Sequence, residues 1–409
     1  MHMRKVTVAI AGLALIAAAC SGATSTSAPS QPADSPAMSD APTSQAPSSD
    51  APAPSGPAVP TEVGEGEGEL NLVAWAGYVE DDWVTPFEQE TGCQVNATLG
   101  NTSDEMVTLM RSGNFDGVSA SGDASNRLIA GGDVAAVNLD LIPNYANVFE
   151  GLKGRPHNTV DGVPYGVPHG RGANLLMWRT DVVDPAPDSW GVVFDPNSPY
   201  KGKVTAYDAP IYIADAAVYL MATQPDLGIT NPYELDETQF NAAVDLLKQQ
   251  RTIIGKYWSL YTDEQAAFAA GDSVVGTTWQ VIKNLLDADN VPVEVTLPKE
   301  GATGWSDTWM ISSQAKNPNC MYLWMDYIIS PAANAAATVY FGEAPVSNEG
   351  CAEAEKLSPG HCDTFHATDE EYFGKVYYWA TPQADCGDER GAVCKDFSEW
   401  VQAWTEIKG

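Results

Sequence analysis

The sequence predicts an α/β protein of two lobes, each built on a mainly parallel sheet that is covered by helices. From residue 69 onward, short apolar strands alternate with amphipathic helices, which favours a sheet with both faces covered. Residues 70–409 amount to 340 residues, more than one ordinary hydrophobic core, and this length indicates two lobes. We find no internal repeat of about 20–50 residues, so a solenoid or a propeller is not expected.

The first 20 residues indicate export. Two basic residues precede the apolar run Val6–Ala19, which is shorter than the about 20 residues of a membrane span and is typical of a secretory signal. Cys20 follows three alanines and resembles the lipidated first residue of bacterial lipoproteins, although Ala17 stands where leucine is usual. We therefore expect residues 1–20 to be a lipoprotein signal peptide. The exported chain would then be attached to the outer face of the cell membrane only through a lipid on Cys20.

The next segment, residues 21–69, is rich in Ser, Ala, Pro, Thr and Gly and contains no aromatic residue. Such a segment cannot bury enough apolar surface to offset its chain entropy, so we expect a disordered tether. Residues 70–409 carry a net charge of −28. A domain this acidic is a poor binder of nucleic acid, is repelled by anionic lipid and attracts small cations.

The cysteines agree with an oxidising compartment. Six remain after Cys20, and an even number in an exported chain favours disulfides. The short spacings suggest the local pairs Cys351–Cys362 and Cys386–Cys394, which would leave Cys93 with Cys320. Six cysteines allow about 15 connectivities, so other pairings stay open at this point.

The elements are expected in the following order. The first strand ends at Trp75, and the helix after it places Trp83, Val84 and Phe87 on one face and stops at Gly92. Further strands are predicted at residues 94–99, 115–121, 203–207 and 291–298, and further helices at 103–111, 233–250, 263–271 and 321–329.

The stretch 291–315 carries the first indication of function. It predicts a strand, a Lys-Glu-Gly loop and a second extended run that contains Trp305, Asp307 and Trp309. Residues two apart on a strand share a face, so we expect the carboxylate to lie between two indole rings. This arrangement suits an organic cation, because the acid pairs with its charge and the ring faces attract it. The alternative is an edge strand with two buried tryptophans and a solvated acid.

Several motifs, taken in order, resemble one family of proteins. The opening LNLVAWAGYVEDDWVTPFEQETGCQV contains Trp-x-x-Tyr after a strand and Glu-Thr-Gly at the end of a helix. It is followed by Gly162-Val-Pro-Tyr-Gly-Val-Pro168, Tyr200-Lys-Gly-Lys203, Trp279, and Pro298-Lys-Glu-Gly301 with Trp305-x-Asp307. This series resembles the extracellular solute-binding proteins of ABC importers, in the branch that binds spermidine and putrescine. The resemblance spans essentially all of residues 70–409.

The resemblance implies the two-lobed periplasmic-binding-protein fold, with the ligand in a cleft between lobes joined by crossover strands. Lobe 1 would comprise residues 70–171 and 302–352, and lobe 2 residues 172–301 and 353–409. It further implies a monomeric binding protein without a cofactor, which is not an enzyme. Its partners would be a small cationic ligand and the transmembrane subunits of an ABC permease.

The same resemblance suggests roles for individual residues. Trp75 and Tyr78 resemble aromatic walls of the cleft, and Ser121 a polar contact after the third strand. Asp208 resembles an acid that receives one amine and Asp307 the acid for the other. Trp279 and Trp305 resemble ring faces that cover the alkyl chain of the ligand.

The chain departs from this family at four positions. Ala76 stands where a hydroxyl is frequent, and Ile211 where a second acid would follow the first. Asp123 stands where an aromatic residue is common, and Glu343 falls near the position of a cleft tyrosine. We therefore add Asp123 and Glu343 to the candidate ligand-binding residues, since the anchors for the amine could have moved.

Other functions remain as alternatives. The same fold could bind an amino-acid derivative, a quaternary amine or a sugar. Arg171, which could contact a carboxylate of the ligand, or the loss of the second acid would favour this alternative. His361, Asp363 and His366 match no metal-ligand spacing, so no metal is expected. Residues 377–379 resemble the tyrosine pair of iron-binding relatives but are better explained as core and cleft rim. A secreted hydrolase is the remaining possibility, although the chain contains no G-x-S-x-G motif.

Overall fold

The computed structural model describes residues 59–409. The signal segment 1–20, the lipid acceptor Cys20 and tether residues 21–58 lie outside the described residues, so these expectations stay predictions. The last part of the tether is described, and its expected end at residue 69 is wrong. The carboxylate of Glu67 accepts hydrogen bonds of 2.9 Å from the backbone N–H groups of Asn319 and Cys320. These groups lie in the first turn of a helix, where the backbone N–H groups have no partner within the helix. Because Glu67 supplies that partner, its hydrogen bonds hold the segment against the helix.

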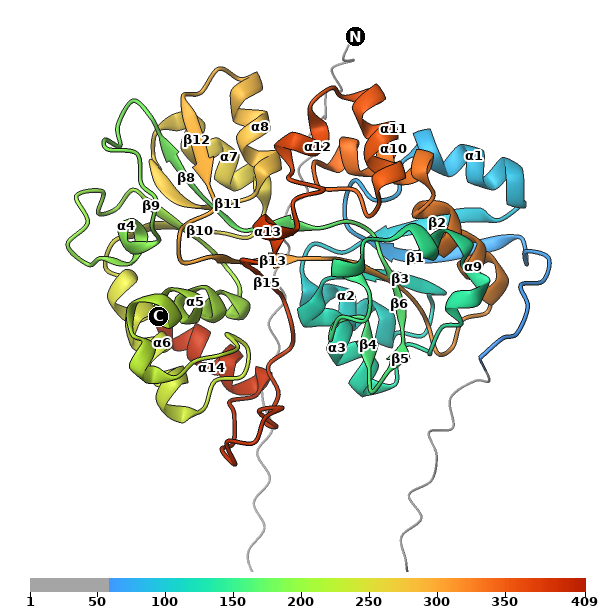
Figure 1. Ribbon diagram of the computed structural model, residues 1–409, viewed down its shortest axis with the longest axis horizontal. Coiled ribbons are helices and arrows are strands. Elements are labelled where there is room, and N and C mark those ends of the chain that lie inside the picture. Colours follow the sequence, from blue (N-terminus) through green and yellow to red (C-terminus); the bar gives the residue numbers. More distant parts are fainter. Residues whose placement is uncertain (1–58) are drawn as a thin grey trace, which may run out of the picture. The chain divides into compact units, whose positions relative to one another are not determined.

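The first lobe is built on a five-stranded sheet with the spatial order β2, β1, β3, β14, β6 (Figure 1). β1 pairs with β2 and β3 in parallel, whereas β14 is antiparallel to β3 and β6. The strands are β1 (Glu69–Ala74), β2 (Gln94–Leu99), β3 (Gly117–Ala120), β6 (Gly166–Pro168) and β14 (Thr308–Ile311), and a hairpin is formed by β4 (Thr159–Val160) and β5 (Val163–Pro164). The helices of this lobe are α1 (Asp81–Thr91), α2 (Ser103–Arg111), α3 (Gly122–Gly131), α9 (Pro318–Ile328) and α10 (Pro331–Phe341).

The sequence pattern of α1 explains how it forms. Trp83, Val84 and Phe87 are buried on one face, as predicted. The helix ends at Gly92, whose φ of 75° lies in the left-handed region that a residue with a side chain rarely adopts. The predicted first strand and α2 are confirmed as well, α2 with the same bounds.

The second lobe contains another five-stranded sheet, with the order β10, β9, β11, β8, β12. β9 is parallel to β10 and β11, and β8 is antiparallel to β11 and β12. The strands are β8 (Leu175–Arg179), β9 (Val204–Tyr207), β10 (Ile254–Trp258), β11 (Val275–Thr278) and β12 (Val293–Thr296). The helices are α4 (Gly191–Phe194), α5 (Ile213–Thr223), α6 (Glu237–Gln250), α7 (Tyr261–Ala270), α8 (Gln280–Ala288) and α14 (Phe397–Lys408).

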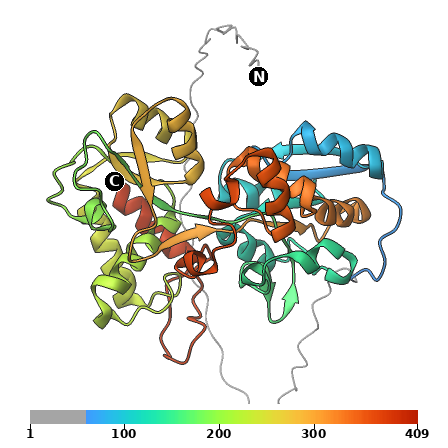
Figure 2. The ribbon, with the colours of Figure 1, turned by 45° about the horizontal axis from the view of Figure 1, so that its top comes forward.

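A three-stranded sheet joins the two lobes (Figures 1 and 2). Its strands are β7 (Gly172–Ala173), β13 (Ala302–Trp305) and β15 (Val376–Tyr378), with β13 in the middle. Gly304 in β13 pairs with both neighbours, and a side chain there would overlap the backbone oxygen of Gly172. The predicted two-lobed α/β architecture with crossover strands is confirmed.

The interpretation of residues 305–309 as one strand is wrong. The chain leaves the crossover sheet at Trp305 and enters the first-lobe sheet at Thr308, so two strands of different sheets replace the expected one. Trp309 therefore does not share a face with Asp307. It is fully buried in the core of the first lobe, and its Nε1–H donates to Nδ1 of His169 at 2.9 Å.

One expected lobe limit, between residues 352 and 353, is contradicted because it falls inside α11 (Asn348–Leu357). The two short helices that follow, α12 (His361–Thr364) and α13 (Glu370–Phe373), also precede the return of the chain to the second lobe. α12 is joined to α11 by the disulfide Cys351–Cys362, so the chain stays with α11 beyond the predicted limit.

The three predicted disulfides are all present. Besides Cys351–Cys362, the structure contains Cys386–Cys394 and Cys93–Cys320. Cys93 and Cys320 lie 227 residues apart in sequence but within the same lobe. This bridge therefore stabilises the first lobe without restricting the motion of one lobe against the other.

Candidate ligand-binding site

A cavity of about 130 Å³ lies where the strand ends of both large sheets meet the crossover sheet. Ligands of open α/β sheets bind at the carboxyl ends of the strands, and the positions of the lining residues agree with this rule. The first lobe contributes Trp75 and Ser121, and the second contributes Tyr207 and Trp279. The full lining is Trp75, Ala76, Gly100, Asn101, Ser121, Tyr207, Ser259, Leu260, Tyr261, Trp279, Trp305, Asp307, Phe341 and Trp379.

Four of these aromatic side chains form a closed ring of contacts, here called the aromatic ring of four. The centroid of Trp279 is 5.4 Å from that of Trp305 and 5.7 Å from that of Tyr207. Trp379 completes the ring, at 5.7 Å from Tyr207 and 6.3 Å from Trp305. All four rings line the cavity, and aromatic faces attract a positive charge that lies within about 6 Å of the ring centroid.

Asp307 is the single acidic residue that the described residues contribute to the lining, and they contribute no Lys or Arg. Its side chain accepts a hydrogen bond of 2.6 Å from the hydroxyl of Ser121 and one of 2.8 Å from that of Tyr78. Burial raises the pKa of Asp307 to about 6, against the opposing effect of the two hydroxyl donors. The carboxyl group is therefore mainly ionised at neutral pH, inside a largely apolar cavity.

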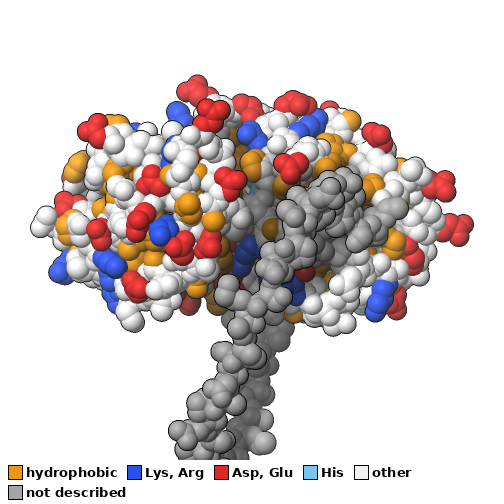
Figure 3. All heavy atoms as spheres, turned by 90° about the horizontal axis from the view of Figure 1, so that it is seen from below, with side chains coloured by type: hydrophobic (Ala, Val, Ile, Leu, Met, Phe, Trp, Pro, Cys, Tyr) orange, Lys and Arg blue, Asp and Glu red, His pale blue; other side chains and the backbone are white. Residues whose placement is uncertain are grey.

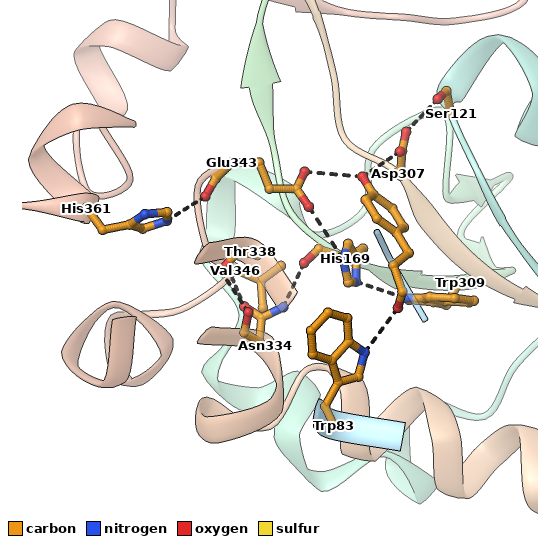
Figure 4. A network of polar contacts seen from close by, with 11 residues as sticks. Trp83, Ser121, His169, Asp307, Trp309, Asn334, Thr338, Glu343, Val346 and His361 are labelled. Atoms are coloured by element: carbon orange, nitrogen blue, oxygen red, sulfur yellow. Dashed lines mark hydrogen bonds and ion pairs between the residues drawn. The ribbon is translucent and has the colours of Figure 1, made fainter. Parts of the chain in front are cut away.

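A second buried acid lies behind Tyr78. The hydroxyl oxygen of Tyr78 is 2.8 Å from Oδ2 of Asp307 and 3.3 Å from Oε2 of the second acid, Glu343, so it lies between the two acids. Figure 4 shows this network, with Asp307 and Ser121 at one end and Glu343 and His169 next to each other. Nε2 of His169 lies 3.5 Å from Oε1 of Glu343. Burial, with the negative charge of Asp307, raises the pKa of Glu343 well above its usual range.

Burial lowers the pKa of His169 to about 3, so its ring is neutral. Because Trp309 donates to Nδ1, the hydrogen of the neutral ring belongs on Nε2, which faces Glu343. The network thus places neutral groups around Glu343 and leaves the charge on Asp307.

The structure brings most of the predicted residues together. Trp75, Ser121, Trp279, Trp305 and Asp307 line the cavity. Tyr78 does not line it, but its hydroxyl holds the carboxylate of Asp307 from behind.

Asp208 does not take the predicted role of an amine acceptor. Both of its carboxylate oxygens lie 2.7 Å from Nζ of Lys408, and Oδ1 also accepts from Nε1 of Trp404 at 3.1 Å. Both partners belong to α14. The C-terminal helix therefore supplies an internal cation to the acid, which a comparison of local motifs does not reveal.

The two additional candidates, Asp123 and Glu343, also lie outside the cavity lining. Asp123 is in the first turn of α3 and accepts a hydrogen bond of 2.9 Å from the hydroxyl of Ser103. Arg127, one turn further along α3, provides the nearby positive charge. Glu343 contacts Tyr78 and His169 rather than the open space. Neither acid is placed to contact a ligand in the cavity.

Sequence reasoning missed Tyr207 and assigned Trp379 only to the core and cleft rim. Tyr207 directly precedes Asp208 at the end of β9, so the alternation of the strand could have marked it as the residue that faces the cleft. Trp379 follows the crossover strand β15, and its position depends on the pairing of β15 with β13. That pairing joins segments about 70 residues apart, and no local pattern predicts it.

The acidic surface does not by itself mark the site. Asp and Glu side chains are spread over the face in Figure 3 rather than gathered in one patch. None of the helices within residues 59–409 has the length and apolar character needed to cross a membrane.

The family model of bacterial extracellular solute-binding proteins matches residues 82–360 of this chain. A putrescine-binding periplasmic protein of Pseudomonas aeruginosa, SpuD, is 27% identical over 318 residues, covering 70% of this chain and 84% of that protein. The putrescine-binding periplasmic protein PotF of Escherichia coli is 26% identical over 312 residues, covering 71% and 82%. The solved spermidine/putrescine ABC transporter substrate-binding protein PotD of Streptococcus pneumoniae has a TM-score of 0.66 at 16% identity, over 83% of this chain and 99% of that one.

Proposed function

Because this chain belongs to the bacterial extracellular solute-binding proteins, we propose that it is the substrate-binding component of an ABC importer for a polyamine or a similar organic cation. The names of the relatives, which bind putrescine, support this choice of ligand class. In the proposal the protein acts by binding and release, and not by catalysis. It is a monomer held at the membrane by a lipid on Cys20, and it delivers its ligand to the permease.

The observation that carries the proposal is the position of Asp307. The residue is 3% exposed, and it is the acid of a cavity otherwise lined by aromatic, apolar and uncharged polar residues. A charge held in such surroundings is poorly hydrated, so a cation that pairs with it gains more than at an exposed surface. The ring faces provide the second attraction, through their negative quadrupoles.

The crossover strands connect ligand binding to recognition by the permease, because the lobes would close about them. The cavity takes Trp75 and Ser121 from one lobe and Tyr207 and Trp279 from the other, so a ligand that contacts all four would favour the closed arrangement. In this proposal the three strands β7, β13 and β15 act as the hinge, and the permease recognises the closed form.

The experiment is calorimetry on the purified chain with organic amines and a neutral sugar. We expect binding of at least one amine and no heat from the sugar. The same titrations on Asp307→Asn should show strongly weakened amine binding. A control variant, Asp188→Asn, makes the same chemical change at an acid that is 79% exposed and paired with Lys299, and it should bind as the wild type does. Binding of the sugar, or of no amine at all, would overturn the proposal.

A further inference from the structure

Resting on the proposed function, we infer that the cavity selects a compact organic cation with a single positive charge and discriminates against linear diamines. A compact ligand agrees with the size of the space. The cavity of about 130 Å³ is close to the about 150 Å³ that accommodates a benzene ring in another protein. The discrimination against a second charge rests on the state of each acid near the site.

The first step is the charge of the lining. A diamine brings two ammonium groups, and each loses part of its hydration on entering the largely apolar cavity. Asp307 can compensate one of them, whereas the other lining residues among those described carry no negative charge. A buried ammonium without a counter-ion is strongly disfavoured, so the second group would oppose binding.

The second step concerns Asp208, the natural partner for a second ammonium, since it follows the lining residue Tyr207 directly. Lys408 contacts both carboxylate oxygens at 2.7 Å, and its ammonium thus takes the place that a ligand amine would need. The lysine belongs to α14, whose Trp404 also binds Asp208 and packs in the core of the second lobe. The internal cation is thereby held by a packed helix.

The third step concerns Glu343. The hydroxyl of Tyr78 has one hydrogen, and the shorter distance, 2.8 Å, assigns it to Asp307. The Tyr78 oxygen, 3.3 Å from Glu343, can then accept a hydrogen from Glu343 in the protonated form, which burial beside Asp307 favours. Glu343 is therefore a neutral donor behind Tyr78, and not a second anion.

The fourth step concerns Asp123, which faces α2 and α3. Its carboxylate is engaged by Ser103 of α2 and lies near Arg127 of its own helix, with Asp104 adding a further negative charge. Its side chain is buried and lies outside the lining, so an ammonium in the cavity cannot contact it. Asp208 and Asp123 are thus engaged by groups of the protein, and Glu343 is neutral.

The remaining features favour a methylated head group. Both oxygens of Asp307 already accept a hydrogen bond, so they offer reduced capacity to the three N–H donors of a primary ammonium. A quaternary ammonium has no such donors and interacts through charge and through the aromatic faces. The aromatic ring of four provides those faces on the side of the second lobe and the crossover strands.

The test compares ligands that differ by one charge. n-Butylamine and putrescine share a four-carbon chain and differ by one ammonium, and tetramethylammonium presents the methylated head alone. By calorimetry we expect n-butylamine and tetramethylammonium each to bind at least about tenfold more tightly than putrescine. Equal or tighter binding of putrescine would overturn this inference and leave the proposed function in place. If none of the three cations binds, the inference fails, and spermidine titrated in parallel decides the proposed function, which fails if spermidine does not bind either.

A variant provides an independent readout. Lys408→Met removes the internal cation and leaves Asp208 available, so the affinity for putrescine should rise several-fold relative to that for n-butylamine. Lys248→Met is the matched control, because Lys248 pairs with Glu406 of the same α14 at 3.7 Å and does not touch Asp208. The ratio of the two affinities should not change in the control. An unchanged ratio in a folded Lys408→Met protein would overturn the role of the internal ion pair.

Discussion

The two lobes contribute to the cavity in different ways. On the side of the first lobe, Ser121 and Tyr78 hold the carboxylate of Asp307 through hydroxyl groups, and a buried polar network continues to Glu343. On the side of the second lobe the walls are the rings of Tyr207 and Trp279, and Asp208, which follows Tyr207 in sequence, is already paired with Lys408. The acid is thus on one side and the apolar faces are on the other; in the proposed function the acid would anchor the cation and the rings would cover it.

The largest effect is expected from the charged side. Asp307→Asn keeps the shape of the side chain and removes its charge, so cation binding should weaken by about 2–5 kcal/mol while the fold is retained. Calorimetry measures the loss, and circular dichroism checks the fold. An unchanged affinity would show that the two sides of the cavity do not differ as described.

The pH dependence of stability sharpens the same comparison. Burial raises the pKa of Asp307 to about 6, whereas an unfolded chain has a value of about 3.9. The folded state therefore binds the proton more tightly, and the stability that this provides below about pH 4 is lost as the pH rises through 6. The loss is about 3 kcal/mol in the free energy of unfolding, at ~1.4 kcal/mol per pKa unit.

Asp307→Asn lacks this group, so the unfolding free energy of the variant minus that of the wild type should rise by about 2 kcal/mol from pH 4 to pH 7, most of the full amount. Urea unfolding at both pH values, without ligand, measures it. A difference that stays constant would contradict a buried, ionised Asp307.

A somewhat smaller effect is expected for the hydroxyl behind the acid. Tyr78→Phe removes one donor to the carboxylate, so the pKa of Asp307 should rise and cation binding at neutral pH should weaken by about 1.5–3 kcal/mol. The pH at which binding is half lost should move upward in parallel. Tyr322→Phe is a suitable control, since its hydroxyl accepts from the backbone of Asn138 elsewhere in the first lobe. Equal effects of both variants would indicate a structural role only.

The smallest effect is expected from the apolar side. Trp305→Leu removes one face of the aromatic ring of four and should weaken cation binding by about 1–2 kcal/mol. Trp305→Phe retains a ring and should recover part of the loss. If the loss in Trp305→Leu exceeded that in Asp307→Asn, the aromatic faces and not the acid would dominate recognition.

The sequence by itself determined the fold class and five of the fourteen residues that line the cavity. In α1 and α2 the apolar residues recur three and four positions apart, and such a local pattern predicts a helix without a structure. The spacing and the even number of cysteines suggested the three disulfides among about 15 possible connectivities, and the structure contains them. Trp75, Ser121, Trp279, Trp305 and Asp307 could be named as candidates because the order of motifs in the chain resembles that of the polyamine-binding family.

Only the tertiary structure decided which acids remain free to meet a ligand. Asp208 and Asp307 each stand at the end of a strand, yet one is paired with a lysine 200 residues away and the other is not. The break between β13 and β14 likewise separates Trp309 from Asp307, because the two strands belong to different sheets. Hydrogen bonds and ion pairs between distant segments set the charge of a side chain, and their partners are chosen by packing that no local pattern encodes.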